Sequence, residues 1–333
     1  MIELRNGDCL ELMKNIPDKS IDMVLTDPPY NIGKAEWDKI EDYTNWCMNW
    51  IKESIRVLKE NGTFIFWHND ISQAAEIIHE IKKNTNFVFN SVGMWHKPNF
   101  RSISWKNTGG NCGLRSWFNV FEFFFVFINP VAGKAWDKTG LEYIYSNKEC
   151  FKPLKEWYIS ELERLGLNIK DIGRKYTEVT GRKPHMVERH YFKDSQFELP
   201  TQEVYESVYI PLGFNKSYEE LRQSYEELRQ PYGELRPVFN IEQGETYSNY
   251  FIADKNNTSN NSYHPCMKPL NILEKLVNTH TKENATVLDC FMGSGSTGVA
   301  CINTNRNFIG IELDQKYFKI AEQRINAAIA EKE

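Results

Sequence analysis

Short apolar runs alternate with helically spaced apolar residues over the first 130 residues of the chain. Helical spacing predicts one helix over residues 46–58, which Asn61-Gly62 ends, and a second helix near residues 72–82. Four other runs have the length and composition of strands: residues 21–25, 63–67, 87–95 and 120–128. Strands separated by helices of this length predict a mostly parallel sheet covered by helices on both faces.

The pattern changes between residues 136 and 245, where helical, polar and turn-rich segments replace the continuous apolar runs. Strand-like runs return at residues 286–289 and 308–312, with a glycine-rich loop between them. We therefore predict one discontinuous α/β domain, formed by residues 1–135 and 246–333, into which a mostly helical region of residues 136–245 is inserted.

The inserted region contains a seven-residue repeat. The sequence Ser-Tyr-Glu-Glu-Leu-Arg-Gln occupies residues 217–223 and 224–230, and a degenerate copy occupies 231–237. Tyrosines and leucines at spacings of three and four share one face of a predicted helix over 217–237: Tyr218, Leu221, Tyr225, Leu228, Tyr232 and Leu235. The stripe favours packing on its own domain, because two or three heptads are short for an independent coiled coil. A dimer contact or a strut that holds a recognition element is the second interpretation.

The composition is that of a globular protein. Of 333 residues, 41% are hydrophobic and 26% are charged, which argues against disordered and fibrous classes. Seven scattered cysteines without a Cys-x-x-Cys pair exclude a zinc ribbon and a secreted disulfide scaffold, and they fit a reducing cytoplasm. The N-terminus lacks the apolar run of a signal peptide, and the longest apolar stretch, Val120 to Ile128, is too short for a membrane span. With a net charge of −5, any site for a polyanion has to be local.

A glycine-rich loop, Asp289 to Gly298, follows a predicted strand and opens a helix. Its spacing, Gly293-x-Gly295-x-x-Gly298, matches the dinucleotide-binding pattern, and Glu312 lies nineteen positions after Gly293 at the end of the next strand. Glycines let the backbone approach a ligand closely, and a carboxylate accepts hydrogen bonds from both ribose hydroxyls. The loop therefore predicts a nucleoside cofactor and leaves NAD and S-adenosylmethionine both open; a purely structural turn is the alternative.

The segment Asp27-Pro28-Pro29-Tyr30 directly follows another predicted strand. Two prolines cannot continue a central strand, so the chain leaves the sheet here, at the edge where α/β sheets bind ligands. The prolines stiffen the backbone so that the Asp27 carboxylate and a carbonyl can accept the two N–H bonds of an exocyclic amino group. Tyr30 offers a ring on which a flat base can stack. A rigid turn without chemistry is the alternative.

Together, Asp27-Pro28-Pro29-Tyr30 and Phe291-Met292-Gly293-Ser294-Gly295 resemble the motifs of the S-adenosylmethionine-dependent DNA amino-methyltransferases. The order of the catalytic turn, the insertion and then the cofactor loop resembles that family's β group, which has a circularly permuted Rossmann-like sheet and an inserted target-recognition region. Four further stretches fit the group: Asn6 to Cys9, Trp95 to Asn99, Glu122 to Phe125 and His264 to Pro269. The resemblance covers residues 1–130 and 260–325, and the insertion matches only in position.

The resemblance implies three sets of site residues. The catalytic turn would be Asp27, Pro28, Pro29 and Tyr30. The S-adenosylmethionine site would include Asp8 at the adenine, Glu312 at the ribose and Lys268 near the methionine carboxylate, with Cys9, Asp289, Phe291, Gly293, Gly295, Ser296 and Thr297 completing it. The base pocket would contain Trp95, Lys97 and Asn99, although a tryptophan at the end of a strand is more often a core residue.

The implied reaction needs neither a metal nor a covalent enzyme intermediate. Asp27 and the Pro28 carbonyl would accept both N–H bonds of the target amine, which localises the nitrogen lone pair for attack on the methyl group. The target base has to be flipped out of the duplex and stacked on Tyr30. Aspartate at the first position of the turn favours N6 of adenine in this family, and N4 of cytosine is the alternative.

The positive charge expected of a DNA-binding protein is concentrated between Arg164 and Lys193, where eight lysines and arginines stand against three acids. Residues 154–165 and 169–176 are predicted helices around the turn 166–168, in the rhythm of a helix-turn-helix. The predicted DNA contacts are Arg174, Lys175, Arg182, Lys183 and Arg189. A solvated charged face is the alternative explanation of this run.

We therefore predict a sequence-specific methyltransferase of double-stranded DNA, in the cytoplasm of a bacterial or phage-infected cell and without a membrane partner. An NAD-dependent oxidoreductase would use the glycine loop but leave Asp27 to Tyr30 without a role. A methyltransferase of protein glutamine or RNA, and a catalytically silent DNA-binding module, are further alternatives. A homodimer and a cognate restriction endonuclease are partners that the sequence leaves open.

Overall fold

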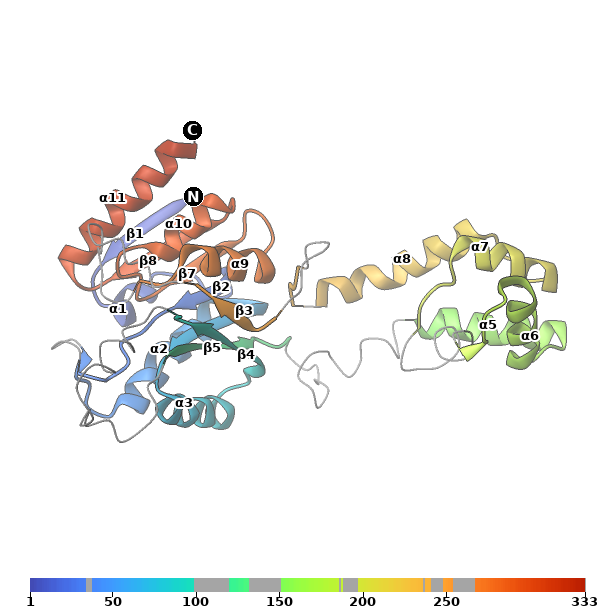
Figure 1. Cartoon of the computed structure of the whole chain (residues 1–333), viewed down its shortest axis with the longest axis horizontal. Coiled ribbons are helices and arrows are strands. Elements are labelled where there is room, and N and C mark those ends of the chain that lie inside the picture. The colour runs from blue at the N-terminus through green and yellow to red at the C-terminus, as the bar shows by residue number, and fades with distance from the viewer. Residues whose placement is uncertain are drawn as a thin grey trace. The chain divides into compact units, whose positions relative to one another are not determined.

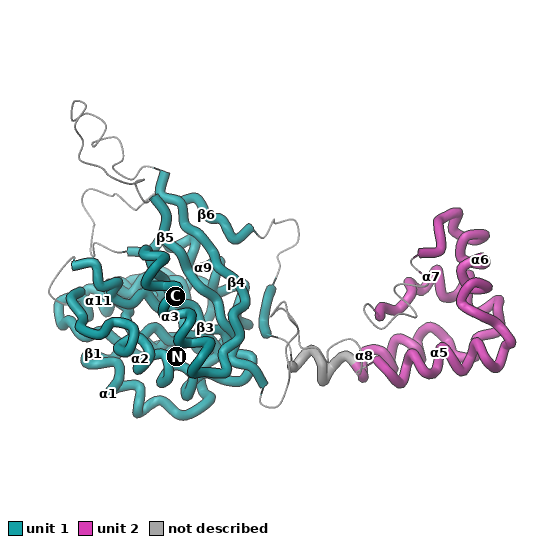
Figure 2. Tube along the Cα trace, turned by 90° about the horizontal axis from the view of Figure 1, so that it is seen from below, with its two compact units in different colours: residues 1–132, 237–333 teal, residues 133–236 magenta. Residues whose placement is uncertain are grey.

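The computed structural model describes residues 1–33, 38–98, 120–131, 151–185, 187, 197–235, 237–240, 248–253 and 267–332. The chain forms two compact units, Met1–Ala132 with Pro237–Glu333 and Gly133–Arg236 (Figure 2). The predicted insertion extended to residue 245, but the structure joins Pro237 onward to the first unit. There the backbone N–H of Asn240 donates to the Thr279 carbonyl at 2.8 Å.

The first unit is built on a mixed sheet of eight described strands, in the order β1-β8-β7-β2-β3-β5-β4-β6 (Figure 1). The strands are β1 Ile2–Asn6, β2 Ile21–Thr26, β3 Leu58–His68, β4 Val88–His96, β5 Phe121–Ile128, β6 Tyr250–Ile252, β7 Thr286–Asp289 and β8 Asn307–Glu312. Neighbours are parallel except that β5 runs against both β3 and β4. The predicted α/β fold is confirmed, with one reversed strand.

Strand side chains alternate between the two faces of the sheet. Both faces carry apolar side chains, and helices cover each of them. Figure 1 shows α1, α2 and α3 on one side of the sheet and α9, α10 and α11 on the other. Along β3, Phe64 and Phe66 pack in one core with residues of α1, α2 and α3, whereas Ile65 and Trp67 pack in a second core with residues of α9, α10 and α11. These helices are α1 Cys9–Met13, α2 Tyr43–Val57, α3 Ile71–Asn84, α9 Leu270–His280, α10 Ser296–Asn303 and α11 Gln315–Lys332.

The role predicted for Asn61-Gly62 is wrong. Asn61-Gly62 was expected to end the helix that began at Trp46, but α2 already ends at Val57 and β3 runs through both residues. Asn61 adopts a left-handed φ of 62° and its N–H donates to the Asn129 carbonyl at 2.7 Å. The pairing of β3 with β2 shifts register across this point, so Asn61-Gly62 marks a bulge within a strand.

The second unit is helical around its own aromatic core. Its elements are α5 Lys152–Leu165, α6 Ile169–Thr180, α7 Gln202–Val204, a π-helical turn Tyr205–Tyr209, a 3-10 turn Ile210–Leu212 and α8 Tyr218–Leu235. The two helices predicted around the turn 166–168 are confirmed as α5 and α6. Gly166 ends α5 in a left-handed conformation, and the Asn168 side chain caps α6.

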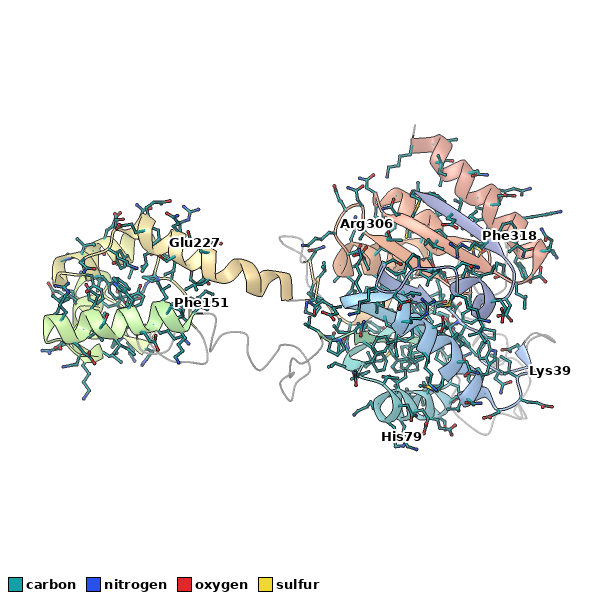
Figure 3. The ribbon with its side chains drawn as sticks, turned by 180° about the vertical axis from the view of Figure 1, so that it is seen from behind. Lys39, His79, Phe151, Glu227, Arg306 and Phe318 are labelled. Carbon is teal, nitrogen blue, oxygen red and sulfur yellow. The ribbon has the colours of Figure 1, made fainter. Side chains whose placement is uncertain are left out.

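The heptad stripe packs on its own unit over the part of α8 whose side chains are described. Leu221 is fully buried, and Tyr218, Tyr225 and Leu228 pack against the same core. Phe151, labelled in Figure 3, lies at the start of α5. The Tyr225 ring of α8 stacks on the Phe151 ring, with their centroids 4.6 Å apart. Tyr232 and Leu235 have side chains outside the described part.

Among the helices that the structure describes, none has the length and apolar character to cross a membrane.

Candidate active site

The two sequence motifs meet because their strands are neighbours. β2 and β7 are parallel and paired, so the turn after β2 and the glycine loop after β7 leave the sheet at the same edge. β8 lies on the other side of β7, which brings Glu312 to that edge, and β1 beside it brings Gly7 and Asp8. Ligands of open α/β sheets bind at this carboxyl edge.

A cavity of about 360 Å³ lies at the edge, a volume that suits a small-molecule ligand. Nine of the predicted residues line it: Asp8, Cys9, Asp27, Pro28, Pro29, Tyr30, Phe291, Gly293 and Glu312. The carboxylate of the catalytic turn and the first glycine of the loop thus face the same space. Within the described residues, no cluster of histidine, cysteine and acidic side chains forms a metal site.

The Glu312 carboxylate is held at the cavity by backbone donors. The N–H of Gly293 donates to its Oε2 at 2.9 Å, and the N–H of Asp314 donates to its Oε1 at 2.8 Å. Burial raises the pKa of Glu312, although both backbone bonds oppose this shift. Gly293 has a φ of 50°, which favours glycine at the point where the loop passes the carboxylate.

Asp8 is also fixed by the backbone. Its Oδ1 accepts the N–H of Leu10 at 2.7 Å and thereby caps α1. The neighbouring Cys9 is buried, and burial raises the pKa of its thiol to about 12. Both residues face the cavity, and the Cys9 thiol remains protonated at neutral pH.

Four predicted cofactor residues belong to the glycine-rich segment but are outside the set that lines the cavity: Asp289, Gly295, Ser296 and Thr297. The buried Asp289 accepts hydrogen bonds from the Thr26 hydroxyl at 2.8 Å and from the Phe291 N–H at 3.1 Å. Burial raises the pKa of Asp289 to about 6, against hydrogen bonds from Thr297 and Thr26. These contacts attach the loop to the sheet.

Gly295 and Ser296 connect the loop to α11. A Cβ on Gly295 would lie 3.0 Å from the Ala321 Cβ, so this glycine permits close packing of the helix. Arg324 reaches back from α11, and its Nη1 donates to the Ser296 hydroxyl at 3.2 Å and to the Ser294 carbonyl at 2.5 Å. The later part of the glycine pattern therefore contacts the protein interior in this structure.

Both oxygens of the Asp27 carboxylate have donors. The Tyr30 hydroxyl donates to Oδ1 at 2.5 Å, and the Lys268 ammonium binds Oδ2. Lys268 was expected near the methionine carboxylate of the cofactor; it does not line the cavity and is 5% exposed. Its ammonium also lies over the rings of Tyr30 and Trp67, at 5.4 and 5.3 Å from their centroids.

Lys268 belongs to a buried chain of alternating charges. Its ammonium is 3.2 Å from Glu122 Oε2, and Lys97 donates to Glu122 Oε1 at 2.7 Å. Burial alone would raise the pKa of Glu122, but the ammonium groups of Lys268 and Lys97 lower it to about 2. The sequence placed Glu122 only in a family-like stretch and did not single it out as a site residue.

Two of the three predicted base-pocket residues, Trp95 and Lys97, lie outside the set that lines this cavity. Trp95 is 1% exposed in the core under α9, and its indole N–H donates to the Ala253 carbonyl at 2.8 Å. Lys97 contacts Glu122, and neither residue lines the cavity. Asn99 lies outside the described residues.

Aromatic residues of α2 form a wall of the cavity that the sequence did not reveal. Trp46 and Trp50 line it, with ring centroids 5.5 and 5.4 Å from Phe291. Asp38 also lines it; this buried carboxylate accepts the N–H of Asn31 at 2.7 Å. Tryptophans four residues apart signal one helix face, but the same spacing describes an ordinary core face.

The predicted DNA contacts lie in the second unit. Arg174 and Lys175 are on α6 and pair with Asp171 and Glu178, respectively. Arg182 and Lys183 are exposed just beyond the end of this helix, and Arg189 lies outside the described residues.

The chain is similar to known DNA methyltransferases in sequence and in fold. A DNA methylase family model of the N6/N4 type matches residues 21–323. The Type II methyltransferase M.BglII of Bacillus subtilis is 25% identical over 96% of this chain and 68% of its own length. The Type II methyltransferase M.HinfI of Haemophilus influenzae is 26% identical over 96% and 67%, respectively.

Two solved structures share the fold. The M1.HpyAVI–SAM complex aligns with a TM-score of 0.54 and 21% identity over 98% of this chain and all of that chain. The PvuII cytosine-N4-specific DNA methyltransferase aligns with a TM-score of 0.52 and 15% identity over 98% and 90%. By its match over residues 21–323, the chain belongs to the N6/N4 family of DNA methylases, the amino-methyltransferases that use S-adenosylmethionine.

Proposed function

We propose that this protein transfers a methyl group to the exocyclic N6 of an adenine that is flipped out of double-stranded DNA. The observation that carries the proposal is the cavity into which Asp27 to Tyr30 and the glycine loop both face. The glycine loop alone left NAD and S-adenosylmethionine open, and family membership favours S-adenosylmethionine. A nicotinamide enzyme would leave Asp27 to Tyr30 without a role, whereas a DNA amino-methyltransferase uses this turn to bind the target amine.

The residues of the cavity fit the cofactor. Glu312 and Asp8 present carboxylates whose positions are fixed by backbone donors, and their remaining lone pairs can accept ribose and adenine donors. Phe291, Trp46 and Trp50 supply flat apolar walls. Bound S-adenosylmethionine supplies an electrophilic methyl group on a sulfonium. Asp289 and Arg324 fix the glycine loop through hydrogen bonds with the Phe291 N–H and the Ser294 carbonyl, respectively.

The catalytic turn would bind the target amine. Asp27 and the Pro28 carbonyl accept its two N–H bonds, and this favours a nitrogen with a localised lone pair. Lys268 compensates the negative charge of Asp27 within a buried, hydrogen-bonded network. Tyr30 would offer its ring to the flipped base, since this residue lines the cavity together with Asp27.

The second unit would recognise the target sequence. It is compact by itself, and Arg182 and Lys183 expose positive charge at the end of α6. Phosphate contacts by such residues would position DNA without reading its sequence. The relatives M.BglII and M.HinfI are Type II methyltransferases, which supports a place for this chain in a restriction–modification system.

The test is methyl transfer from labelled S-adenosylmethionine to unmodified DNA, followed by digestion to nucleosides and mass spectrometry. We expect N6-methyladenine from the wild type and no product from Asp27→Ala, with the Kd for S-adenosylmethionine unchanged. Asp18→Ala, which removes an exposed carboxylate, is the matched control and should keep full activity. N4-methylcytosine as the product would replace adenine by cytosine in the proposal, and full activity of Asp27→Ala would refute the role of the turn.

A further inference from the structure

A buried histidine at the end of β3 has both ring nitrogens engaged. His68 is 0% exposed, and its Nδ1 lies 3.0 Å from the backbone nitrogen of Asp70. A backbone N–H can only donate, so Nδ1 carries the lone pair and the ring proton of the neutral form is on Nε2. The backbone thus assigns the tautomer of His68.

The same reasoning gives the direction of the next two hydrogen bonds, from His68 to Tyr43 and from Tyr43 to Pro29. His68 Nε2 lies 3.0 Å from the Tyr43 hydroxyl, and that hydroxyl lies 2.7 Å from the Pro29 carbonyl oxygen. A carbonyl can only accept, so Tyr43 donates to Pro29 and accepts from His68. A directed chain of three hydrogen bonds therefore runs from Asp70 through His68 and Tyr43 to the second proline of the catalytic turn.

This chain of hydrogen bonds contacts the catalytic turn from outside the cavity. Neither His68 nor Tyr43 lines the cavity, whereas Pro28 and Pro29 do. The pyrrolidine ring restricts φ of Pro29, so holding its carbonyl oxygen also restricts the preceding peptide, which carries the Pro28 carbonyl. The His68 ring lies against the Tyr30 ring as well, with centroids 4.8 Å apart.

We propose that His68 and Tyr43 are positioning residues that orient the Pro28 carbonyl and Asp27 for the target amine by holding the Pro29 carbonyl. This role rests on the proposed function of the turn. It assigns a task in methyl transfer to α2 and to the end of β3, two segments outside the motifs that the sequence singled out.

The charge state of the histidine supports this role. Burial lowers the pKa of His68, although Asp70, Asp27 and Asp38 all favour the charged ring. Burial also raises the pKa of Tyr43, which the nearby Cys47 reinforces, so the hydroxyl keeps its proton. Protonation of His68 would place a hydrogen on Nδ1, opposite the Asp70 N–H, and break the chain at its first bond.

Tyr43→Phe removes one hydroxyl and keeps the ring. We expect it to lower the single-turnover rate of methyl transfer by about tenfold, the effect of one lost hydrogen bond on the reaction. The Kd for S-adenosylmethionine should stay within about twofold, because the variant leaves the cavity wall intact. Tyr205→Phe is the matched control, since its hydroxyl donates to the Lys216 carbonyl in the other unit; it should retain the wild-type rate.

A double-mutant cycle tests whether His68 and Tyr43 act through the same hydrogen-bond chain. His68→Leu should slow transfer as Tyr43→Phe does, and the double variant should be no slower than either single one. His68→Gln, which can still donate to Tyr43, should recover part of the rate and lose the decline at acidic pH that comes from charging the imidazole. A wild-type rate in Tyr43→Phe, or additive effects of the two substitutions, would overturn the proposal.

The controls separate this inference from the function on which it rests. If the wild type methylates DNA and Asp27→Ala does not, while Tyr43→Phe is fully active, only the positioning role fails. If the wild type leaves DNA unmodified, the proposed function itself fails.

Discussion

The Lys268 ammonium binds Oδ2 of Asp27, although 241 positions separate the two residues in the chain. Their side chains are 4% and 21% exposed. Asp27 follows β2, and Lys268 lies just before α9, so the contact joins segments from opposite ends of the discontinuous unit. It places a buried positive charge on the carboxylate that is proposed to bind the target amine.

Lys268→Met keeps the length of the side chain and removes its charge. We expect the rate of methyl transfer to fall by at least about 100-fold, because the Asp27 carboxylate loses its buried counter-charge. The Kd for S-adenosylmethionine, measured by calorimetry, should change by less than about threefold, since Lys268 does not line the cavity. A rise in this Kd comparable to the loss of rate would instead support the contact with the cofactor carboxylate that the sequence implied.

Glu122→Gln should alter the pH dependence of stability. The folded-state pKa of Glu122 is about 2 against an ordinary value of 4.5. Its charged form therefore stabilises the fold above pH 4.5, and this contribution disappears as the pH falls from 4.5 towards 2. In urea titrations at pH 7 the variant should lose about 3 kcal/mol, as when one partner of a buried ion pair is removed.

Glu11→Gln provides the control for this measurement. Glu11 pairs with Lys14 on the surface, where their side chains are 69% and 62% exposed. Such a pair contributes less than about 1 kcal/mol, so the control should remain close to the wild type. Equal losses in Glu122→Gln and Glu11→Gln would show that the buried chain of charges adds no stability.

Gly295→Ala should destabilise the first unit. Its Cβ would lie 3.0 Å from the Ala321 Cβ and 3.1 Å from the Ala321 Cα, on a residue whose φ is 79°. We expect a loss of about 2 kcal/mol or more in thermal or urea unfolding, from overpacking added to backbone strain. Gly181→Ala isolates the strain, because its φ is 68° and no atom lies within 4 Å of the added Cβ. Gly181→Ala should therefore cost only about 1 kcal/mol.

The double variant Arg182→Gln with Lys183→Gln should weaken DNA binding. If both side chains contact phosphates, the slope of log K against log salt should become shallower by about two. Lys316→Gln with Lys319→Gln removes the same charge from the exposed side of α11 and is the control. A slope identical to the wild type in the first pair would remove these residues from the DNA interface.

Local periodicity was enough to predict most strands and helices, because whether a segment is extended or helical depends mainly on residues near it in the chain. The failure at Asn61 shows the limit of that reasoning. An asparagine–glycine pair can end a helix or form a bulge, and the choice depended on Asn129, a residue of the neighbouring strand segment.

The sequence by itself determined that a proline-stiffened carboxylate follows one strand and a glycine loop follows another. Only the tertiary structure decided what these groups touch. Because β2 lies between β7 and β3, and β5 follows β3 in the sheet, Asp27 meets Lys268, and Glu122 from β5 meets Lys268 and Lys97. The same packing directs Trp46 into the cavity wall and Trp95 into the core. Contacts between distant residues depend on strand order and side-chain direction, which no local pattern in the chain specifies.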